Sequence, residues 1–361
     1  MSEKIRFGIL SFAHFHANFW AEAVKISPHA SLAGVWDDQQ ARGREAAGRH
    51  GTQFEPDLAA LLSRCDAVGI TSETARHADL VEAAAAAGVN ILLEKPMATS
   101  LVECERIGQA IERSGLTFMQ NFPKRFDPVN LELVRRVKAG ELGKILVARV
   151  RHGNYHLSQL GDQAGGNWFT DPALSGGGAL LDEGIHAADF LLWLHGEPQS
   201  AFAMTSSTGL GLPQEDTAIA VYRFPDGALG EIVTGNALLA AQESVEVYGT
   251  EGVALLSGVD LASRELSRPP YLRFFKQGEP RTGWQGSKVK PKFQDPDFHY
   301  GGPLHFIECL REGKAPVTGF EEGWKSLAMI LASYRAARDG QMKALDFSQP
   351  GSSGLDTGAA G

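Results

Sequence analysis

Short apolar runs alternate with stretches of helical spacing through the first third of the chain. The apolar runs, which read as buried strands, are residues 5–10, 31–36, 67–71, 89–93 and 116–121. The intervening helical patterns are residues 17–26, 39–50, 56–63, 77–87 and 100–114. Strands that alternate with helices predict an α/β domain with a doubly wound parallel sheet of about six strands, ending near residue 122.

The pattern changes after that point. A helix is expected over residues 129–139, before Gly140, and strands over residues 144–150, 218–224, 229–234, 245–248 and 253–256. Tight turns join the last four strands in pairs, at residues 225–227 and 249–252. Helices over 304–312 and 323–338 follow. We therefore predict a second, α+β domain with an open, predominantly antiparallel sheet.

These patterns divide the chain into residues 1–122, residues 123–348 and a glycine- and serine-rich tail, residues 349–361, which we expect to be disordered. The Pro-, Gly- and Lys-rich segment 267–302 reads as a long loop. One face of the second sheet should carry helices. Since an open apolar face rarely stays exposed, we expect the other face to pair with a second subunit, giving a homodimer or homotetramer.

Composition excludes several classes of protein. The chain has 361 residues, of which 43% are hydrophobic, so it can bury large cores. A net charge of −9 disfavours a nucleic-acid partner. Three cysteines lie far apart without metal-type spacing, which is typical of a reducing compartment. With no apolar segment long enough for a membrane span, we expect a cytoplasmic protein.

The loop after the first strand is where a dinucleotide-binding fold holds the pyrophosphate. Ser11, Ala13 and His16 occupy the three positions of the G-x-G-x-x-G fingerprint, so its glycines are absent. His14 and His16 could contact phosphate or nicotinamide, or they could fill a gap between helix and sheet. Asp37 ends the second strand, where a carboxylate binds the adenosine ribose and favours NAD over NADP; an acidic turn is the alternative.

Lys95 lies at the carboxyl end of an apolar strand, between Glu94 and Pro96. Open α/β sheets place their chemistry at this edge. There an ammonium can lose its charge by desolvation, or keep it to stabilise an oxyanion. The alternative is a solvated lysine at a strand end.

A second cluster follows a glycine run in the later half of the chain. If Asp182 opens a helix, His186 and Asp189 project from the same face. A carboxylate one turn from an imidazole can orient it as a general base. Asp182 also suits a helix cap, and His186 a core position. The spacing could supply metal ligands, but no third His or Cys matches it locally, so we predict no metal.

The combination of motifs resembles the Gfo/Idh/MocA family of glucose-fructose oxidoreductases and inositol dehydrogenases. The resemblance rests on Glu94-Lys95-Pro96 together with Gly177-Gly178 and Asp182-x-Gly184-x-His186-x-x-Asp189, and it extends over residues 4 to 345. Further matching positions are Thr71, His77, Arg125, Pro128 and Trp168.

The resemblance implies an NAD(P)-binding Rossmann domain, residues 1–122, and a domain for substrate binding and oligomerisation, residues 123–348. Lys95, Asp182 and His186 would be catalytic, with His186 as the acid/base. The candidate cofactor contacts are Ser11, Phe12, Ala13, His14, His16, Asp37, Thr71, Ser72, His77, Glu94, Lys95 and Asn121. The candidate substrate contacts are Lys95, Arg125, Asn154, Tyr155, His156, Trp168, Asp182 and His186.

Three functions fit this sequence. The first is an NAD-dependent oxidoreductase that transfers hydride between nicotinamide and a hydroxyl-bearing carbon of a sugar, sugar derivative or cyclitol. The second is a glycoside hydrolase or lyase that keeps NAD bound and oxidises its substrate transiently. The third is a nucleotide-sensing regulator without turnover, against which the presence of Lys95, Asp182 and His186 argues. We predict the first.

Overall fold

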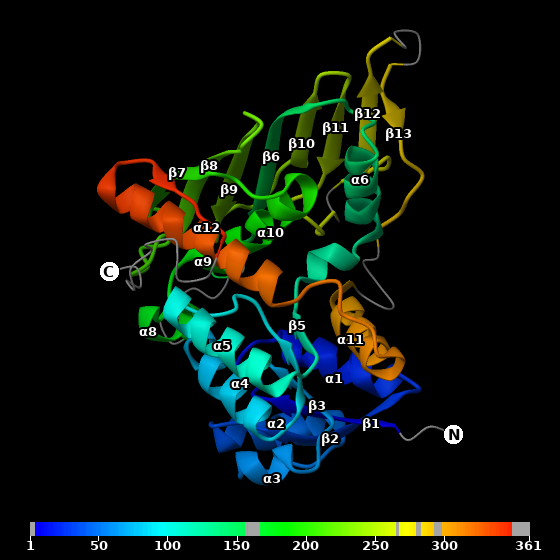
Figure 1. Ribbon diagram of the computed structural model, residues 1–361, viewed down its shortest axis with the longest axis vertical. Coiled ribbons are helices and arrows are strands. Elements are labelled where there is room, and N and C mark those ends of the chain that lie inside the picture. The colour runs from blue at the N-terminus through cyan, green and yellow to red at the C-terminus, as the bar shows by residue number, and fades with distance from the viewer. Residues whose placement is uncertain are drawn as a thin grey trace.

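A computed structural model describes residues 4–155, 157, 167–264, 267–278, 283–291 and 298–348. Two sheets organise the chain, one in each half of the molecule (Figure 1). The tail, residues 349–361, lies outside the described residues, so its disorder stays a prediction.

The amino-terminal sheet is parallel, with strand order β2-β1-β3-β4-β5. Its strands are β1 (Ile5–Leu10), β2 (Ala30–Trp36), β3 (Ala67–Ile70), β4 (Asn90–Leu93) and β5 (Phe118–Gln120). Each predicted run forms a strand, but the expected total of about six is wrong. After β5, Pro123 begins a 3₁₀ turn, η2 (Pro123–Phe126), and proline cannot donate to a sheet ladder. No sixth strand joins this sheet within the described ranges.

The helices between these strands are α1 (His16–Ile26), α2 (Gln40–His50), α3 (Leu58–Leu62), α4 (His77–Ala86) and α5 (Leu101–Ser114). Their ends follow local chemistry. The Ser100 hydroxyl accepts a hydrogen bond from the amide of Glu103 and so caps α5. Gly88, just after α4, has φ +72°, a conformation that favours glycine. This alternation puts the carboxyl ends of all five strands at one edge.

The second sheet has nine strands in the order β13-β12-β11-β10-β6-β9-β8-β7-β14. These are β6 (Ile145–Gly153), β7 (Ser200–Ser206), β8 (Thr217–Arg223), β9 (Leu229–Gly235), β10 (Glu243–Gly249), β11 (Gly252–Ser257), β12 (Leu272–Lys276), β13 (Gln285–Gly286) and β14 (Lys343–Ala344). Only the β6–β9 pair among them is parallel, so the predominantly antiparallel prediction is confirmed. The sequence patterns missed β7, β12, β13 and β14.

Helices cover one face of the nine-stranded sheet. The long helix α12 (Phe320–Asp339) and α10 (Gly184–His195) lie across it (Figure 1). Along β8 the side chains alternate, with Ala220 and Tyr222 buried beneath the helices and Ile219 and Val221 exposed on the opposite face. The shorter helices of this half are α6 (Pro128–Lys138), α8 (Pro172–Ser175) and α9 (Ala179–Asp182). None of the described helices has both the length and the apolar character needed to cross a membrane.

The helix α11 (Gly301–Glu312) returns from the second half to the first and lies beside α1 (Figure 1). Phe306 and Ile307 of α11 are buried in the same apolar cluster as Phe7 and Trp20. The rings of Phe7 and Phe306 meet edge to face, with centroids 6.4 Å apart. The core of the amino-terminal domain therefore contains residues from both ends of the chain.

Arg264 connects α6 to the loop after β11. Its side chain is fully buried, and its guanidinium donates to Asp127, which is equally buried, and to Asn130. It also donates to the carbonyl oxygens of Leu261 and Ala262. Burial raises the pKa of Asp127, and the adjacent Arg264 charge opposes that rise.

We expect Arg264→Met to lower the free energy of unfolding by about 3–5 kcal/mol, because the Asp127 carboxylate would stay buried without its partner. Urea denaturation followed by circular dichroism measures this loss. The matched control is Arg135→Met, which removes an exposed pair with Glu132 and should leave the midpoint unchanged. Equal midpoints for both variants would contradict the structural role of Arg264.

Candidate active site

An ion pair between the two halves of the molecule forms the centre of the site. Lys95 follows β4, and its Nζ donates to Asp182 Oδ1 at 2.7 Å and to the Asp182 carbonyl oxygen at 2.9 Å. The Lys95 side chain is only 3% exposed. Burial acts to lower the pKa of Lys95, but the carboxylates of Asp182, Glu183 and Glu94 outweigh it and raise that pKa. Lys95 therefore keeps its charge.

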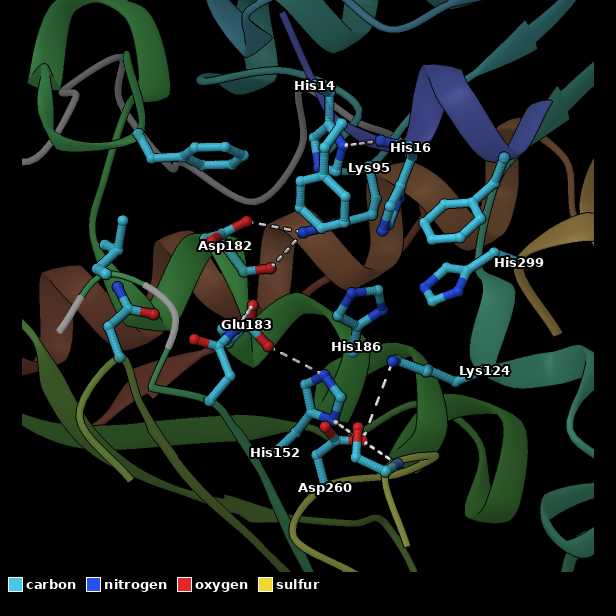
Figure 2. A pocket seen from close by; sticks show the side chains of 17 residues that line it. His14, His16, Lys95, Lys124, His152, Asp182, Glu183, His186, Asp260 and His299 are labelled. Atoms are coloured by element: carbon cyan, nitrogen blue, oxygen red, sulfur yellow. Dashed lines mark hydrogen bonds and ion pairs between the residues drawn. The ribbon is translucent and has the colours of Figure 1, made fainter. Parts of the chain in front are cut away.

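His186 lies beside this pair on α10, facing the same pocket (Figure 2). Burial first, and then the charge of Lys95, hold the pKa of His186 well below its usual value, so the ring is neutral. Its Nδ1 is buried without a hydrogen-bond partner among the described residues. His152 packs against the ring edge to face, with centroids 4.7 Å apart. A neutral imidazole with an unused nitrogen can accept a proton.

The helix that we expected to begin at Asp182 begins earlier. Asp182 ends α9, and α10 starts at Gly184. We predicted that Asp182 orients His186, but its carboxylate binds Lys95 instead. Asp189 binds Arg125. The cause is Glu215, whose carboxylate accepts from the amides of Gly178 and Leu180 and so caps α9 three residues before Asp182.

Glu215 also explains part of the glycine run before α9. A Cβ added at Gly178 would lie 2.0 Å from the Glu215 carbonyl oxygen, so only glycine fits there. The Tyr334 hydroxyl of α12 donates to the Glu215 carboxylate at 2.6 Å. These partly buried contacts fix the start of α9 and thereby the position of Asp182.

A pocket of about 210 Å³ opens between the two halves, around Lys95, Asp182 and His186 (Figure 2). Its other polar lining side chains are His14, His16, Lys124, His152, Asn154, Glu183, Asn236, Asp260, Ser263 and His299. Five of the chain's eleven histidines therefore face one cavity.

Acidic side chains on the floor of the pocket are already hydrogen-bonded. Glu183 accepts from Asn154 at 2.6 Å and from His152 at 3.1 Å. Burial would raise the pKa of Glu183, but His152 and the nearby lysines outweigh it and lower that pKa. Asp260 accepts from two backbone amides, and Lys124 Nζ lies 4.0 Å from it. These carboxylates hold the polar residues of the floor in fixed positions.

The loop between β1 and α1 adopts a glycine-like turn without glycine. Ser11 has φ +72°, the one positive φ of a non-glycine residue in the described chain. Its hydroxyl accepts from the amide of Ala13 at 3.1 Å. The amide of His14 donates to Thr71, and the amide of His16 donates to the His14 ring. Several amides that a phosphate would bind in this fold are thus bonded within the protein.

Asp37 lies at the predicted end of β2 but is engaged with the protein. The carboxylate accepts from both Nε and Nη2 of Arg42 at 2.8 Å and from the amide of Phe12 at 2.8 Å. The Ser11 hydroxyl and the amide of Gln39 complete its shell. A ribose hydroxyl would have to compete with these donors, so the role of Asp37 stays a prediction.

Strand-end residues support the Lys95 turn. His77 lies between the carbonyl oxygens of Ser72 and Pro96, at 3.2 Å and 2.9 Å from its ring nitrogens. Thr71 donates its hydroxyl proton to the carbonyl of Ser11. Asn121 donates to Glu94 Oε2 at 3.1 Å. These predicted cofactor residues thus adjoin one another at the sheet edge.

Not all predicted substrate contacts lie in the pocket. Asn154 lines it, whereas Arg125 makes a bidentate pair with Asp189 and stacks over Trp193. Tyr155 is 38% exposed and is not among the lining residues. Trp168 donates from Nε1 to the Ala13 carbonyl at 3.0 Å and lines an adjoining surface pocket with Arg42. His156 lies outside the described residues.

Several lining residues escaped prediction although they adjoin predicted ones. Lys124 precedes Arg125, Glu183 follows Asp182, and His152 lies two residues before Asn154. Their closeness in the sequence to predicted residues could have indicated that they line the same pocket. His299 lies in the segment 267–302, which we read as a long loop that shapes the pocket, but no pattern singled out this residue within it.

Two protein-family models match the chain, one in each of its two domains. Residues 5–122 match the family model described as an oxidoreductase family with an NAD-binding Rossmann fold. Residues 131–255 match the model of the GFO/IDH/MocA C-terminal domain.

Curated relatives span almost the whole chain. D-apiose dehydrogenase of Paraburkholderia graminis is 28% identical, over 98% of this chain and 92% of the relative. The scyllo-inositol 2-dehydrogenase (NAD(+)) of Bacillus subtilis is 26% identical, over 96% and 98%. Among solved structures, the aldose-aldose oxidoreductase of Caulobacter crescentus, complexed with glycerol, superposes with a TM-score of 0.81 at 24% identity, covering 95% of this chain and 100% of that one.

Proposed function

The chain belongs to the Gfo/Idh/MocA family of oxidoreductases, and from this premise we propose that it transfers hydride between a nicotinamide dinucleotide and a hydroxyl-bearing carbon. The proposed substrate is a sugar, a sugar derivative or a cyclitol, the class named for several relatives. The observation that carries the proposal is the buried Lys95–Asp182 pair beside the unpartnered Nδ1 of His186.

Lys95 is proposed to stabilise negative charge on the reacting oxygen. Its raised pKa keeps the ammonium protonated, which suits an electrostatic role and not that of a base. Asp182 fixes the ammonium through Oδ1 and the main-chain oxygen. The second carboxylate oxygen of Asp182 can then accept from a substrate hydroxyl.

His186 is proposed to take the hydroxyl proton. The ring lines the pocket and is neutral because burial lowers its pKa, so one of its two nitrogens carries a lone pair that can accept a proton. When the hydroxyl loses its proton to His186, the oxygen gains negative charge beside Lys95. The two side chains thus divide the task between proton transfer and charge stabilisation.

The residues at the sheet edge fit a nicotinamide dinucleotide. Ser11 takes the left-handed backbone conformation that the first fingerprint glycine would supply. Strand-end residues Thr71, Glu94, Lys95 and Asn121 would hold the nicotinamide end, close to the pocket. The dinucleotide supplies the hydride acceptor or donor of the reaction.

We propose NAD over NADP, since Asp37 disfavours a 2′-phosphate. Arg42 opposes this preference, because an arginine at this place can bind a 2′-phosphate. Its guanidinium pairs with Asp37, and its side chain is 22% exposed and lines the adjoining pocket. A comparison of both nucleotides therefore bears directly on the Asp37–Arg42 pair.

Incubation with NAD or NADP and a panel of sugars, inositols and aryl glycosides tests the function. We expect NADH absorbance with one substrate class and calorimetric binding of NAD more tightly than NADP. Aglycone release without net NADH would favour the NAD-retaining hydrolase, and neither signal would favour a regulator. If neither nucleotide bound, the cofactor assignment would be overturned.

Lys95→Met is the accompanying variant. We expect its turnover to fall at least ~100-fold, since it removes the charge beside the reacting oxygen. Lys25→Met, which alters an exposed lysine paired with Glu22, should keep full activity. Circular dichroism checks that both variants are folded. A Lys95→Met enzyme with more than a tenth of the wild-type rate would remove Lys95 from the chemistry.

The pH profile tests His186. Since the neutral ring is the active form and its pKa is lowered, kcat/KM should hold near neutral pH and fall only on the acid side of the usual histidine value. His186→Asn should lose ~100-fold or more near neutral pH and recover partly at high pH, where hydroxide replaces the base. His195→Asn, at the end of the same helix, is the control. An unchanged profile for His186→Asn would count against this role.

We further propose that two chains associate through the open face of the nine-stranded sheet. Large apolar side chains stay exposed on its strands: Leu146, Met204, Ile219, Val221, Leu229 and Tyr248. Ile219 of β8 pairs in register with Met204 of β7, so their side chains adjoin. This apolar patch on β7 and β8 borders the Arg149–Glu231 ion pair of β6 and β9, and such a patch, rimmed by polar residues, favours association.

Sedimentation equilibrium should give a dimer or tetramer for the wild type and monomer for Ile219→Asp/Val221→Asp, because the added carboxylates would be desolvated in the interface. Val317→Asp places the same charge on an exposed apolar residue away from this sheet and should leave the assembly intact. A monomeric wild type at micromolar concentration would contradict the proposal.

A further inference from the structure

Two histidines and a glutamate meet where the phosphate loop joins the pocket. A nitrogen of His14, a nitrogen of His16 and a carboxylate oxygen of Glu94 all lie within 4.8 Å of one another, and all three residues are buried. No other group of three or more such ligands was found in the described ranges. His14 and His16 line the wall of the pocket next to Lys95 (Figure 2).

We propose that His14, His16 and Glu94 bind one divalent first-row transition metal ion, such as Zn²⁺, on the wall of the pocket. Two imidazoles with one carboxylate are a donor set that such ions prefer. Local spacing could not reveal it, because Glu94 follows His16 by 78 positions. The site goes beyond the proposed hydride transfer, and it shares Glu94 with the residues proposed to hold the nicotinamide.

Hydrogen bonds already hold the three proposed ligand side chains close to one another. His16 Nδ1 lies 3.1 Å from Glu94 Oε2, so a metal ion would replace the proton that these two atoms share. His14 Nδ1 accepts a hydrogen bond from the amide of His16 at 3.1 Å, so its lone pair would leave that amide on binding an ion. Bonds of about 2.1 Å imply ligand separations of about 3.4 Å in a tetrahedral site. Two ligand atoms at the 4.8 Å limit would therefore close by about 1.4 Å, whereas His16 Nδ1 and Glu94 Oε2 are already within that separation.

A second layer of contacts fixes the carboxylate. Asn121 donates to Glu94 Oε2 at 3.1 Å, and the amide of Lys95 donates to Oε1 at 2.9 Å. Metal-binding carboxylates are commonly held in this way. The ring of His299 lies 4.6 Å from that of His16 and closes the site on the side of α11.

The local charge favours a cation. Glu94, Asp182, Glu183 and Asp260 provide four negative charges, whereas Lys95 and Lys124 provide two positive ones, so neutral imidazoles leave a formal charge of −2. A divalent ion would balance that charge. The ammonium of Lys95 would repel the metal ion only weakly, because its Nζ is paired with Asp182 Oδ1 at 2.7 Å.

The test uses tag-free, chelator-treated full-length protein titrated with Co²⁺ and Zn²⁺, without nucleotide or sugar. We expect one equivalent per chain, with visible Co²⁺ absorption. Glu94→Gln and His14→Asn should each weaken binding at least tenfold, and Asn121→Ala should weaken it about 10–100-fold. His50→Asn alters another buried histidine paired with a glutamate, Glu22, and should bind like the wild type.

No bound ion in the wild type, or equal affinity in Glu94→Gln and His14→Asn, would overturn the site. Circular dichroism establishes that each variant is folded. If Glu94→Gln does not fold, His14→Asn alone tests the site. If His14→Asn weakens NAD binding while the wild type binds no metal, the His14 ring contacts the nucleotide and the metal proposal fails. Because titration precedes any assay of turnover, its outcome is separate from that of the proposed function.

Discussion

The buried ion pair of Lys95 and Asp182 is the interaction on which the site depends. It joins the end of β4 in the parallel sheet to the end of α9 in the second half of the chain. An ammonium that is 3% exposed stays charged only because a carboxylate reaches it. Glu215, just before β8, accepts from the amide of Leu180 and so fixes α9. His77 contacts the Pro96 carbonyl oxygen and so fixes the turn that carries Lys95. The pair therefore sets both the spacing of the two halves and the polarity of the pocket between them.

The loop after β1 shows how a fold can keep a backbone shape while its side chains change. Ser11 reproduces the turn, yet the amides beyond it bond to Thr71 and His14 within the protein. The imidazoles of His14 and His16 then bring ring nitrogens to a place where a glycine loop offers only main-chain groups. Such a loop can present either hydrogen-bond donors or lone pairs at the same surface, which enlarges the range of ligands it can hold.

Sequence patterns predicted the parallel sheet well because β3 is buried throughout and β1 is buried over residues 7–10. The doubly wound order follows from the alternation of strands with helices. They missed β7, rich in small and polar residues, and β13 and β14, which have only two residues each. Lys95 and His186 were predicted from their motifs. The register of α9 was not, because its cap is Glu215, more than thirty positions along the chain. Long-range packing, which no local pattern encodes, also brings His299 to the pocket.

The return of α11 to the amino-terminal domain has a consequence for biosynthesis. Phe306 and Ile307 complete the cluster that contains Phe7 and Trp20, so that core cannot close while only the first 122 residues have left the ribosome. The nascent amino-terminal sheet would expose apolar surface until synthesis has passed α11. In this chain the first domain to be synthesised is therefore completed only by residues made near the end of translation.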